Sequence, residues 1–368
     1  MNAFLIGSPM QLLNATEAKF QLNLQSNHLI ILLGLGYSAE EETYKRLLNP
    51  KEWDTVRYLK LFNTHLQPSR ALFKGAIPRK LCGYIDLGRQ FLNRRAVDRI
   101  ARDFGEVDAL FLGNYLEEWE LYMRHFPHVL KHKSLYLIDD GTDVLKINEE
   151  RRRKPSVTDS RVNPRPSGAW PRIKRSLRRA LIDWQVQEAE KVIFFTAYEF
   201  QVRPGDRIIK NSYSRLRQRT TENNQSGDIF FLGQCLSEDG YLTRQAYLSS
   251  LEKVKAQCEN RPIVYLPHPR ETESLLSEIR TRIKWPIKRL DVPVEWHLSR
   301  GGSWPSRIAS FFCSALPNCA AIFGDKIKIT AFRIQRRDFL KWPDFVDAVY
   351  DKFAAWRIEG SAIEVVQL

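Results

Sequence analysis

Two short motifs place ionisable side chains where they could act on a ligand. Asp139 and Asp140 come directly after the apolar run 135–138, and His268 comes two residues after the apolar run 263–266. Each run predicts a buried strand, and in an open α/β sheet ligands bind beyond the carboxyl ends of the strands. A carboxylate there can take a proton from a hydroxyl group, and an imidazole can donate a hydrogen bond to a phosphate. The two motifs therefore predict a general base and a phosphate-facing histidine.

Each motif also has a purely structural interpretation. Within the first motif we expect Asp139 to be the base and Asp140 to orient the turn or to act as a second carboxylate, while Gly141 lets the backbone bend closely. The alternative is that both aspartates only cap a turn or the next helix. For His268, which is held by Pro269, the alternative is a hydrogen-bonded turn histidine.

Strand-like and helix-like patterns alternate along the chain in two blocks. This alternation predicts α/β domains with parallel sheets covered on both faces. The polar stretch 217–227 contains no large apolar side chain, so we expect it to link an N-terminal domain, 1–216, to a C-terminal domain, 228–333. Residues 334–368 begin with a long helical pattern that can pack back on the first domain.

Positive charge is concentrated in one segment. Eleven of the 57 Lys and Arg residues lie between Arg151 and Arg179, whereas only one of the 43 Asp and Glu residues lies there. The first half of the basic segment 151–190 has the composition of a loop. Its second half, from Trp170, has apolar residues at spacings of three to four, which predicts an amphipathic helix. Such a helix suits an anionic membrane surface. The alternatives are a solvated helix face and, with less support, a nucleic-acid contact.

Other sequence features exclude several classes of protein. The N-terminus does not have the pattern of a signal peptide, and no stretch approaches the ~20 apolar residues of a membrane span. We therefore expect a protein that is soluble or peripheral on a membrane. The chain has no Walker A loop and no HExxH, GxSxG or CxxC motif, which argues against ATPases, zinc hydrolases and serine hydrolases. The scattered cysteines indicate buried thiols in a reducing cytosol rather than disulfides or a metal site; they are Cys82, Cys235, Cys258, Cys313 and Cys319.

Five segments, in order along the chain, carry a resemblance to a known group of enzymes. They resemble bacterial sialyltransferases of the lipooligosaccharide sialyltransferase and capsular polysialyltransferase type. The segments are 7–15, 138–142, 231–234, 267–271 and 305–316. The resemblance implies a GT-B fold, in which two Rossmann-like domains face each other across a deep crevice. It also implies an inverting transfer from a CMP-activated nonulosonic acid, without a metal or a cofactor.

The resemblance further implies roles for two serines. Ser310 and Ser314 match the serine-containing stretch that binds the donor phosphate in related enzymes, and Cys313 stands where a second hydroxyl is often found. We expect a helix from about residue 305 to 315 to carry these residues, and a strand to follow at 320–323. Helix N-termini favour anions, so the start of this helix suits the donor phosphate. The alternative is that both serines are small helix-packing residues.

The remaining donor-side residues lie at other points of the C-terminal domain. Glu295 resembles the acid that can bind cytidine or ribose in the family, and its alternative is a surface charge. Gly233 and Gln234 follow the strand-like run 229–232 and could line the donor pocket.

The leading hypothesis is therefore a cytoplasmic enzyme, peripheral on the inner face of the bacterial inner membrane, that builds a surface glycan. Its partners would be the CMP-activated sugar, a glycan acceptor that can be lipid-linked, and the anionic membrane, with no nucleic acid. A second hypothesis keeps the fold but uses CMP-Kdo or another nucleotide sugar. A third is a non-catalytic membrane- or glycan-binding protein on the same scaffold. Sialic, pseudaminic and legionaminic acids and Kdo share the reacting centre, so the sequence leaves the sugar, the acceptor and the linkage open.

Overall fold

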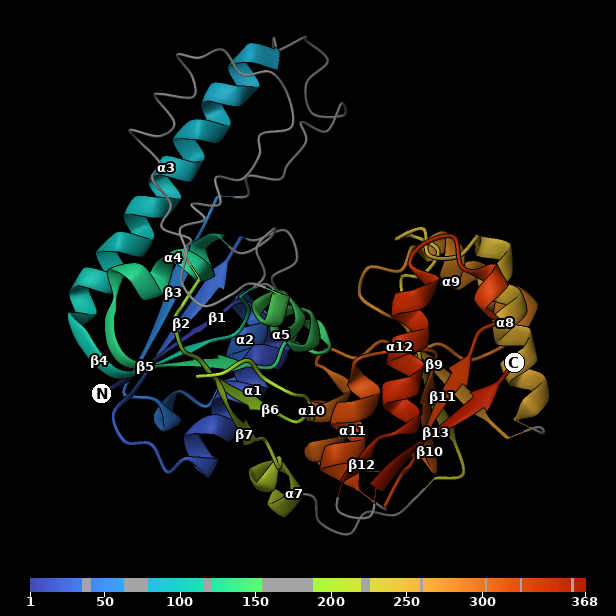
Figure 1. The fold of residues 1–368 in the computed structure, drawn as a ribbon. Helices are drawn as coiled ribbons and strands as arrows, with labels where there is room; N and C mark the ends of the chain where they lie inside the picture. Colours follow the sequence, from blue (N-terminus) through green and yellow to red (C-terminus); the bar gives the residue numbers. More distant parts are fainter. Residues whose placement is uncertain are drawn as a thin grey trace. The chain divides into compact units, whose positions relative to one another are not determined.

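The protein forms two compact α/β units. Unit 1 is Met1–Asn211 and unit 2 is Ser212–Leu368. In this computed structural model, shown in Figure 1, strands and helices alternate in both units. The structure describes residues 1–34, 41–62, 79–115, 121–153, 188–219, 226–258, 261–301, 303–324, 326–358 and 361–368.

Among the described residues, unit 1 has a seven-stranded parallel sheet in the order β3-β2-β1-β4-β5-β6-β7. The strands are β1 (Asn2–Ile6), β2 (Asn27–Leu33), β3 (Thr55–Lys60), β4 (Glu106–Leu112), β5 (Lys131–Ile138), β6 (Ile193–Thr196) and β7 (Arg207–Lys210). The helices are α1 (Pro9–Gln21), α2 (Glu41–Leu47), α3 (Arg79–Phe104), α4 (Leu121–Val129) and α5 (Asp143–Arg153), with a 3-10 turn at Pro50–Glu52. The strand order reverses between β1 and β4, so the carboxyl ends of these two strands flank the switch point where ligands bind in such sheets.

Unit 2 has a six-stranded sheet in its described part, in the order β12-β13-β11-β10-β8-β9. The strands are β8 (Ile229–Leu232), β9 (Ile263–Leu266), β10 (Arg307–Ser310), β11 (Lys328–Arg333), β12 (Arg357–Ile358) and β13 (Ser361–Gln367). The helices are α7 (Ser214–Arg219), α8 (Arg244–Gln257), α9 (Glu273–Glu278), α10 (Val294–Ser299), α11 (Ala315–Phe323) and α12 (Pro343–Ala354), with shorter helical turns at Ile279–Ile283 and Arg336–Asp338. β12 is antiparallel to β13, and the other pairs are parallel. The switch point of this sheet lies between β8 and β10.

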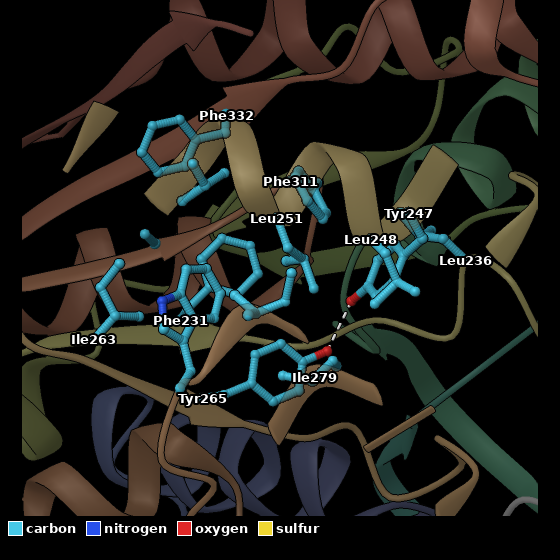
Figure 2. Packing of buried hydrophobic residues seen from close by; sticks show 14 of the residues in the cluster. Phe231, Leu236, Tyr247, Leu248, Leu251, Ile263, Tyr265, Ile279, Phe311 and Phe332 are labelled. Atoms are coloured by element: carbon cyan, nitrogen blue, oxygen red, sulfur yellow. Dashed lines mark hydrogen bonds between the residues drawn. The ribbon is translucent and has the colours of Figure 1, made fainter. Parts of the chain in front are cut away.

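The core of unit 2 packs helices α8 and α9 against the sheet. Figure 2 shows Phe231, Tyr265 and Phe311 from three neighbouring strands or strand ends meeting Leu251 of α8. Phe231 lies against Phe311 with the ring centroids 5.2 Å apart. Both faces of a parallel sheet are covered, which explains why these strands read as continuous apolar runs.

The predicted fold class, α/β with two Rossmann-like domains, is confirmed. The crevice between facing domains stays a prediction. Unit 1 ends at Asn211, before the predicted boundary at 216, because α7 packs on α10 and α11 of unit 2. The predicted linker 217–227 thus begins inside α7, and its part 220–225 lies outside the described residues.

The prediction for the C-terminal segment 334–368 is incomplete, because the segment contains a strand as well as a helix. This segment forms α12 and then β13, which pairs in parallel with β11 of unit 2. Ile363 of β13 is buried, and α12 packs against β11 and β13. The segment therefore completes the second sheet, because the alternating pattern of 361–367 supplies one more strand. Packing of this segment on the first domain stays a prediction.

The predictions for 305–315 and 320–323 are wrong. Residues 307–310 form strand β10, whereas 320–323 lie within helix α11. Short apolar runs do not distinguish a buried strand from a buried helix by periodicity. Here the run 308–311 is buried between β8 and β11 in the middle of the sheet.

The basic segment 151–190 is described at its two ends. Residues 154–187, with most of the predicted amphipathic helix, lie outside the described residues. Arg151 itself is 1% exposed, so it does not belong to a solvated face. Its guanidinium donates two hydrogen bonds to Asp206, at 2.9 and 2.8 Å, and one to Glu188, which also accepts from Arg124. Among helices in the described part of the chain, none is long and apolar enough to cross a bilayer.

We expect Arg151→Ala to lower the free energy of unfolding by roughly 3 kcal/mol, because it leaves the buried carboxylate of Asp206 without its main partner. The matched control is Arg153→Ala on the same helix, whose side chain is 75% exposed and pairs with Glu149, and which should change stability little. Urea unfolding of both variants measures the difference. Equal stabilities would show that the Arg151 network contributes nothing.

Candidate active site

The acidic motif lies at the carboxyl end of β5. Asp139 and Asp140 follow the last strand residue directly, and Gly141 then adopts a φ of 64°. This left-handed conformation favours glycine and turns the chain into α5, which starts at Asp143. The bend expected at Gly141 is confirmed.

Asp139 is completely buried. Its Oδ2 accepts a hydrogen bond from the backbone N–H of Ala197, after β6, at 2.8 Å. Its carbonyl oxygen accepts from Nδ2 of Asn14, which is held in turn by Asn211. Its Oδ1 is buried and has no hydrogen-bond partner among the residues the structure describes. Burial raises the pKa of Asp139 to about 7. The side chain therefore ties β5 to its neighbours and has no exposed oxygen for a substrate.

Asp140 is half-buried, and three neutral side chains donate to it. Ser8 Oγ donates to Oδ1 at 2.9 Å, Gln11 Nε2 donates to Oδ2 at 2.7 Å, and Asn114 Nδ2 lies 3.4 Å from the same oxygen. Burial, and secondarily the charge of Asp143, raise the pKa of Asp140 to about 6. This carboxylate is ionised at neutral pH, held in one orientation, and partly open to solvent.

The structure therefore leaves Asp140, and not Asp139, partly accessible to solvent. The sequence placed the two residues correctly but could not show which one is accessible. It also left Ser8 and Gln11 without a role, although both lie in the segment 7–15. Gln11 is oriented by its own contacts, because its Oε1 accepts from the N–H of Gly7 at 2.6 Å and leaves Nε2 to face Asp140.

In unit 2, His268 follows β9 and is half-buried. Its Nδ1 lies 3.0 Å from Sγ of Cys235 and accepts from the N–H of Arg270 at 3.2 Å. Burial, and then the charge of Arg270, lower the pKa of His268. Burial raises the pKa of the Cys235 thiol to about 12, so it stays protonated. Because Nδ1 accepts, the neutral ring carries its proton on Nε2, which suits donation to a phosphate. Pro269 is exposed in the turn that follows.

The structure separates the two candidate serines. Ser310 is fully buried on β10, and its hydroxyl donates to the carbonyl oxygen of Leu232 at 2.7 Å. The expected phosphate contact by Ser310 is therefore corrected to a structural one. Gln234 is half-buried, and its Oε1 accepts from the N–H of Phe312 at 3.1 Å. Ser314 is half-buried at the N-terminus of α11, and its side chain makes no capping hydrogen bond, so this hydroxyl suits an anion beside the positive end of the helix.

Glu295 is a buried residue. It is 1% exposed on α10, and it accepts a hydrogen bond from Nδ2 of Asn318, on α11, at 3.1 Å. Burial raises its pKa. The interpretation as a surface charge is wrong, and the contact with cytidine or ribose stays a prediction.

Gly233 follows β8 and is buried against two side chains, those of Tyr265 on β9 and of Glu271 in the turn after it. An added Cβ would stand 2.4 Å from Oε2 of Glu271 and 2.5 Å from the hydroxyl of Tyr265. A side chain at position 233 would therefore collide with these two groups, and the expected contribution of Gly233 to a donor pocket stays a prediction. Glu271 is the last residue of the segment 267–271, for which the resemblance implied no role of this acid. Nothing in the sequence indicates that its side chain is buried.

One protein-family model matches part of the chain. The model is described as alpha-2,8-polysialyltransferase (POLYST) and matches residues 175–331. The match includes His268, Gln234 and Ser314, and it excludes the acidic motif of unit 1. It supports a sialyltransferase-type glycosyltransferase. No curated protein sequence matches the chain.

Several solved structures are similar at low identity. The Methanocaldococcus jannaschii UDP-GlcNAc 2-epimerase in complex with UDP-GlcNAc and UDP is 11% identical, with a TM-score of 0.49 and coverage of 100% of this chain and 89% of that one. Arabidopsis thaliana UGT89C1 complexed with UDP is 10% identical, with a TM-score of 0.46 and coverage of 100% and 86%. A putative UDP-N-acetylglucosamine 2-epimerase from Listeria monocytogenes is 7% identical, with a TM-score of 0.48 and coverage of 98% and 84%.

We expect Gly233→Ala to lower the free energy of unfolding by about 1–3 kcal/mol, because the added methyl group overpacks a buried contact. Gly227→Ala is the matched control, since a Cβ there has no atom within 4 Å. Denaturant titration of both variants gives the comparison. A Gly233→Ala protein as stable as the control would contradict the close approach.

Proposed function

We propose that this protein is an inverting, metal-independent glycosyltransferase that moves a nonulosonic acid, sialic acid or a relative, from its CMP-activated donor to a bacterial surface glycan. The observation that carries the proposal is Asp140, an ionised carboxylate after β5. Its three neutral donors follow β1 and β4, the strands on either side of the switch point. The coarser part, a sialyltransferase-type glycosyltransferase, has the support of the family match over 175–331.

The chemistry requires a base for the acceptor. In the proposed step, Asp140 takes the proton of the acceptor hydroxyl, and the oxygen forms a bond to the anomeric carbon of the donor. The bond from that carbon to the phosphate oxygen breaks, and CMP leaves with the electron pair. Attack opposite the leaving group inverts the anomeric centre. Asp140 then passes its proton to water.

The leaving phosphate needs positive or hydrogen-bonding partners. His268 can donate from Nε2, and the free hydroxyl of Ser314 and the positive end of α11 add further stabilisation. These groups supply the stabilisation that a divalent metal supplies in other transferases. We propose that the reaction takes place at the inner face of the bacterial inner membrane, with the basic residues of the segment 151–190 other than the buried Arg151 as the membrane contact.

A donor panel tests the proposal. The full chain is incubated with CMP-linked sialic, pseudaminic and legionaminic acids, CMP-Kdo and UDP-sugars, with and without EDTA, and released nucleotide is measured together with the glycan product. We expect turnover with one of the three CMP-linked nonulosonic acids and no loss on adding EDTA. Turnover with CMP-Kdo or a UDP-sugar instead, a requirement for metal, or nucleotide binding without any transfer would overturn it.

We expect Asp140→Asn to reduce kcat by about 10²- to 10⁴-fold, because the variant cannot accept the proton. Its affinity for CMP should stay within a few-fold, since the base acts on the acceptor. Asp139→Asn, which keeps an acceptor for the N–H of Ala197, should cost far less. The reverse order of the two variants would restore Asp139 as the base.

The pH dependence gives a separate check. Because the pKa of Asp140 is raised to about 6, kcat at saturating donor should be full above that pH and fall as the pH drops through it. Asp143→Asn removes a like charge that contributes to the raised pKa, so its acid limb should move to lower pH. An acid limb that Asp143→Asn leaves in place would argue against Asp140 as the titrating group.

A further inference from the structure

Unit 2 contains a buried carboxylate to which the catalytic proposal assigns no part. Glu271 is 5% exposed and lies in the turn between β9 and α9. Its Oε2 accepts from the backbone N–H of His268 at 2.6 Å, and its Oε1 accepts from the hydroxyl of Tyr265 at 2.5 Å. The Tyr247 hydroxyl lies 3.4 Å from the same oxygen.

The hydrogen bonds run in one direction. Since Tyr265 gives its only hydroxyl proton to Glu271, the 2.8 Å contact between the two tyrosine hydroxyls must have Tyr247 as its donor. The dashed line in Figure 2 marks this contact. The Tyr247 oxygen in turn accepts from the N–H of Gln234 at 3.2 Å. A chain of donors thus connects the loop after β8 to Glu271, which also holds the loop after β9.

We infer that Glu271 is a positioning residue that fixes the loops after β8 and β9 in the one conformation that binds the nucleotide. The inference rests on the proposed function for the identity of the nucleotide. It deepens that function, because it makes the positions of Gln234 and His268 depend on the single side chain of Glu271.

The pattern of donors favours an ionised carboxylate. A proton on Oε2 would face the N–H of His268, and a proton on Oε1 would reverse the two tyrosine hydroxyls, so that Tyr247 no longer donates to Tyr265. Burial raises the pKa of Glu271 to about 7, and the nearby charge of Glu238, in the loop after β8, adds to this. The other titratable groups around it are Tyr265 of β9, Tyr247 of α8, His268 and the thiol of Cys235, with the Arg270–Asp239 ion pair beyond them. Nucleotide affinity should therefore fall as Glu271 gains its proton below neutral pH.

A ligand-free measurement tests the inference first. Hydrogen exchange followed by mass spectrometry compares the wild type with Glu271→Gln at pH 8, in peptides that cover 229–236 and 263–271. The Gln side chain presents an NH₂ group to one of the donors, so one hydrogen bond is lost. We expect exchange in both loops to rise at least about tenfold. A tenfold rise corresponds to about 1.4 kcal/mol, close to the free energy of one hydrogen bond to a charged group. Unchanged exchange in the loop after β8 would overturn the inference.

Two further variants serve as controls, one for general unfolding of Glu271→Gln and one for the loss of a negative charge. Tyr265→Phe keeps the carboxylate and removes the link to the β8 loop, so exchange should rise more in 229–236 than in 263–271. Glu273→Gln loses the same charge two residues away, where the side chain is 65% exposed and pairs with Arg280 and Arg289, and should match the wild type. A rise in both loops in Glu273→Gln would contradict a specific role of Glu271.

The second test uses CMP as the probe. Calorimetry gives the ratio of the dissociation constant of Glu271→Gln to that of the wild type from pH 5.5 to 8.5. We expect a ratio of about ten at pH 8.5 that approaches one at pH 5.5, where the wild type carries a proton on Glu271. The titrations of CMP and of His268 occur in both proteins and cancel in the ratio. A ratio that does not change with pH would show a merely structural residue. If the wild type binds no CMP, the proposed function fails, and the hydrogen-exchange result alone decides the inference.

Discussion

Carboxylates held by neutral hydrogen-bond donors at the carboxyl ends of the strands are the interactions on which both units depend. In unit 1, Asp140 is oriented by Ser8, Gln11 and Asn114, and in unit 2 Glu271 is oriented by Tyr265 and the backbone of His268. Neutral donors orient a carboxylate but compensate less of the cost of burial than a cation would. The pKa values accordingly lie near neutrality, at about 6 and about 7.

Arg151 and Asp206 show the opposite arrangement in the same protein. There a guanidinium neutralises a buried carboxylate through two hydrogen bonds. Such a pair holds structure together, because removing one partner leaves a buried charge without compensation. The contrast separates the carboxylates held by neutral donors from a carboxylate that is paired with a cation.

The parts of the fold with long, clear patterns were predictable from the sequence. The strands that carry the acidic motif and His268 are continuous apolar runs followed by polar residues, and both motifs lie at strand ends as expected. Ser310 was misplaced because the run 308–311 fits a strand and a helix equally well. The sequence could not show which of Asp139 and Asp140 is accessible. Asp139 is held inside by the backbone N–H of Ala197, a residue far along the chain that the pairing of β6 with β5 brings close. The role of Glu271 depends likewise on tyrosines from α8 and β9.

The central claim is that unit 2 holds the nucleotide and Asp140 of unit 1 accepts the proton. The most direct measurement is an experimental structure of the protein with an unreactive fluorinated analogue of the CMP-linked sugar. The account predicts a phosphate oxygen within hydrogen-bond distance of His268 Nε2 and of the Ser314 hydroxyl, with Asp140 the carboxylate nearest the anomeric carbon. A nucleotide bound away from these residues, or an anomeric carbon nearer to Asp139 than to Asp140, would contradict it.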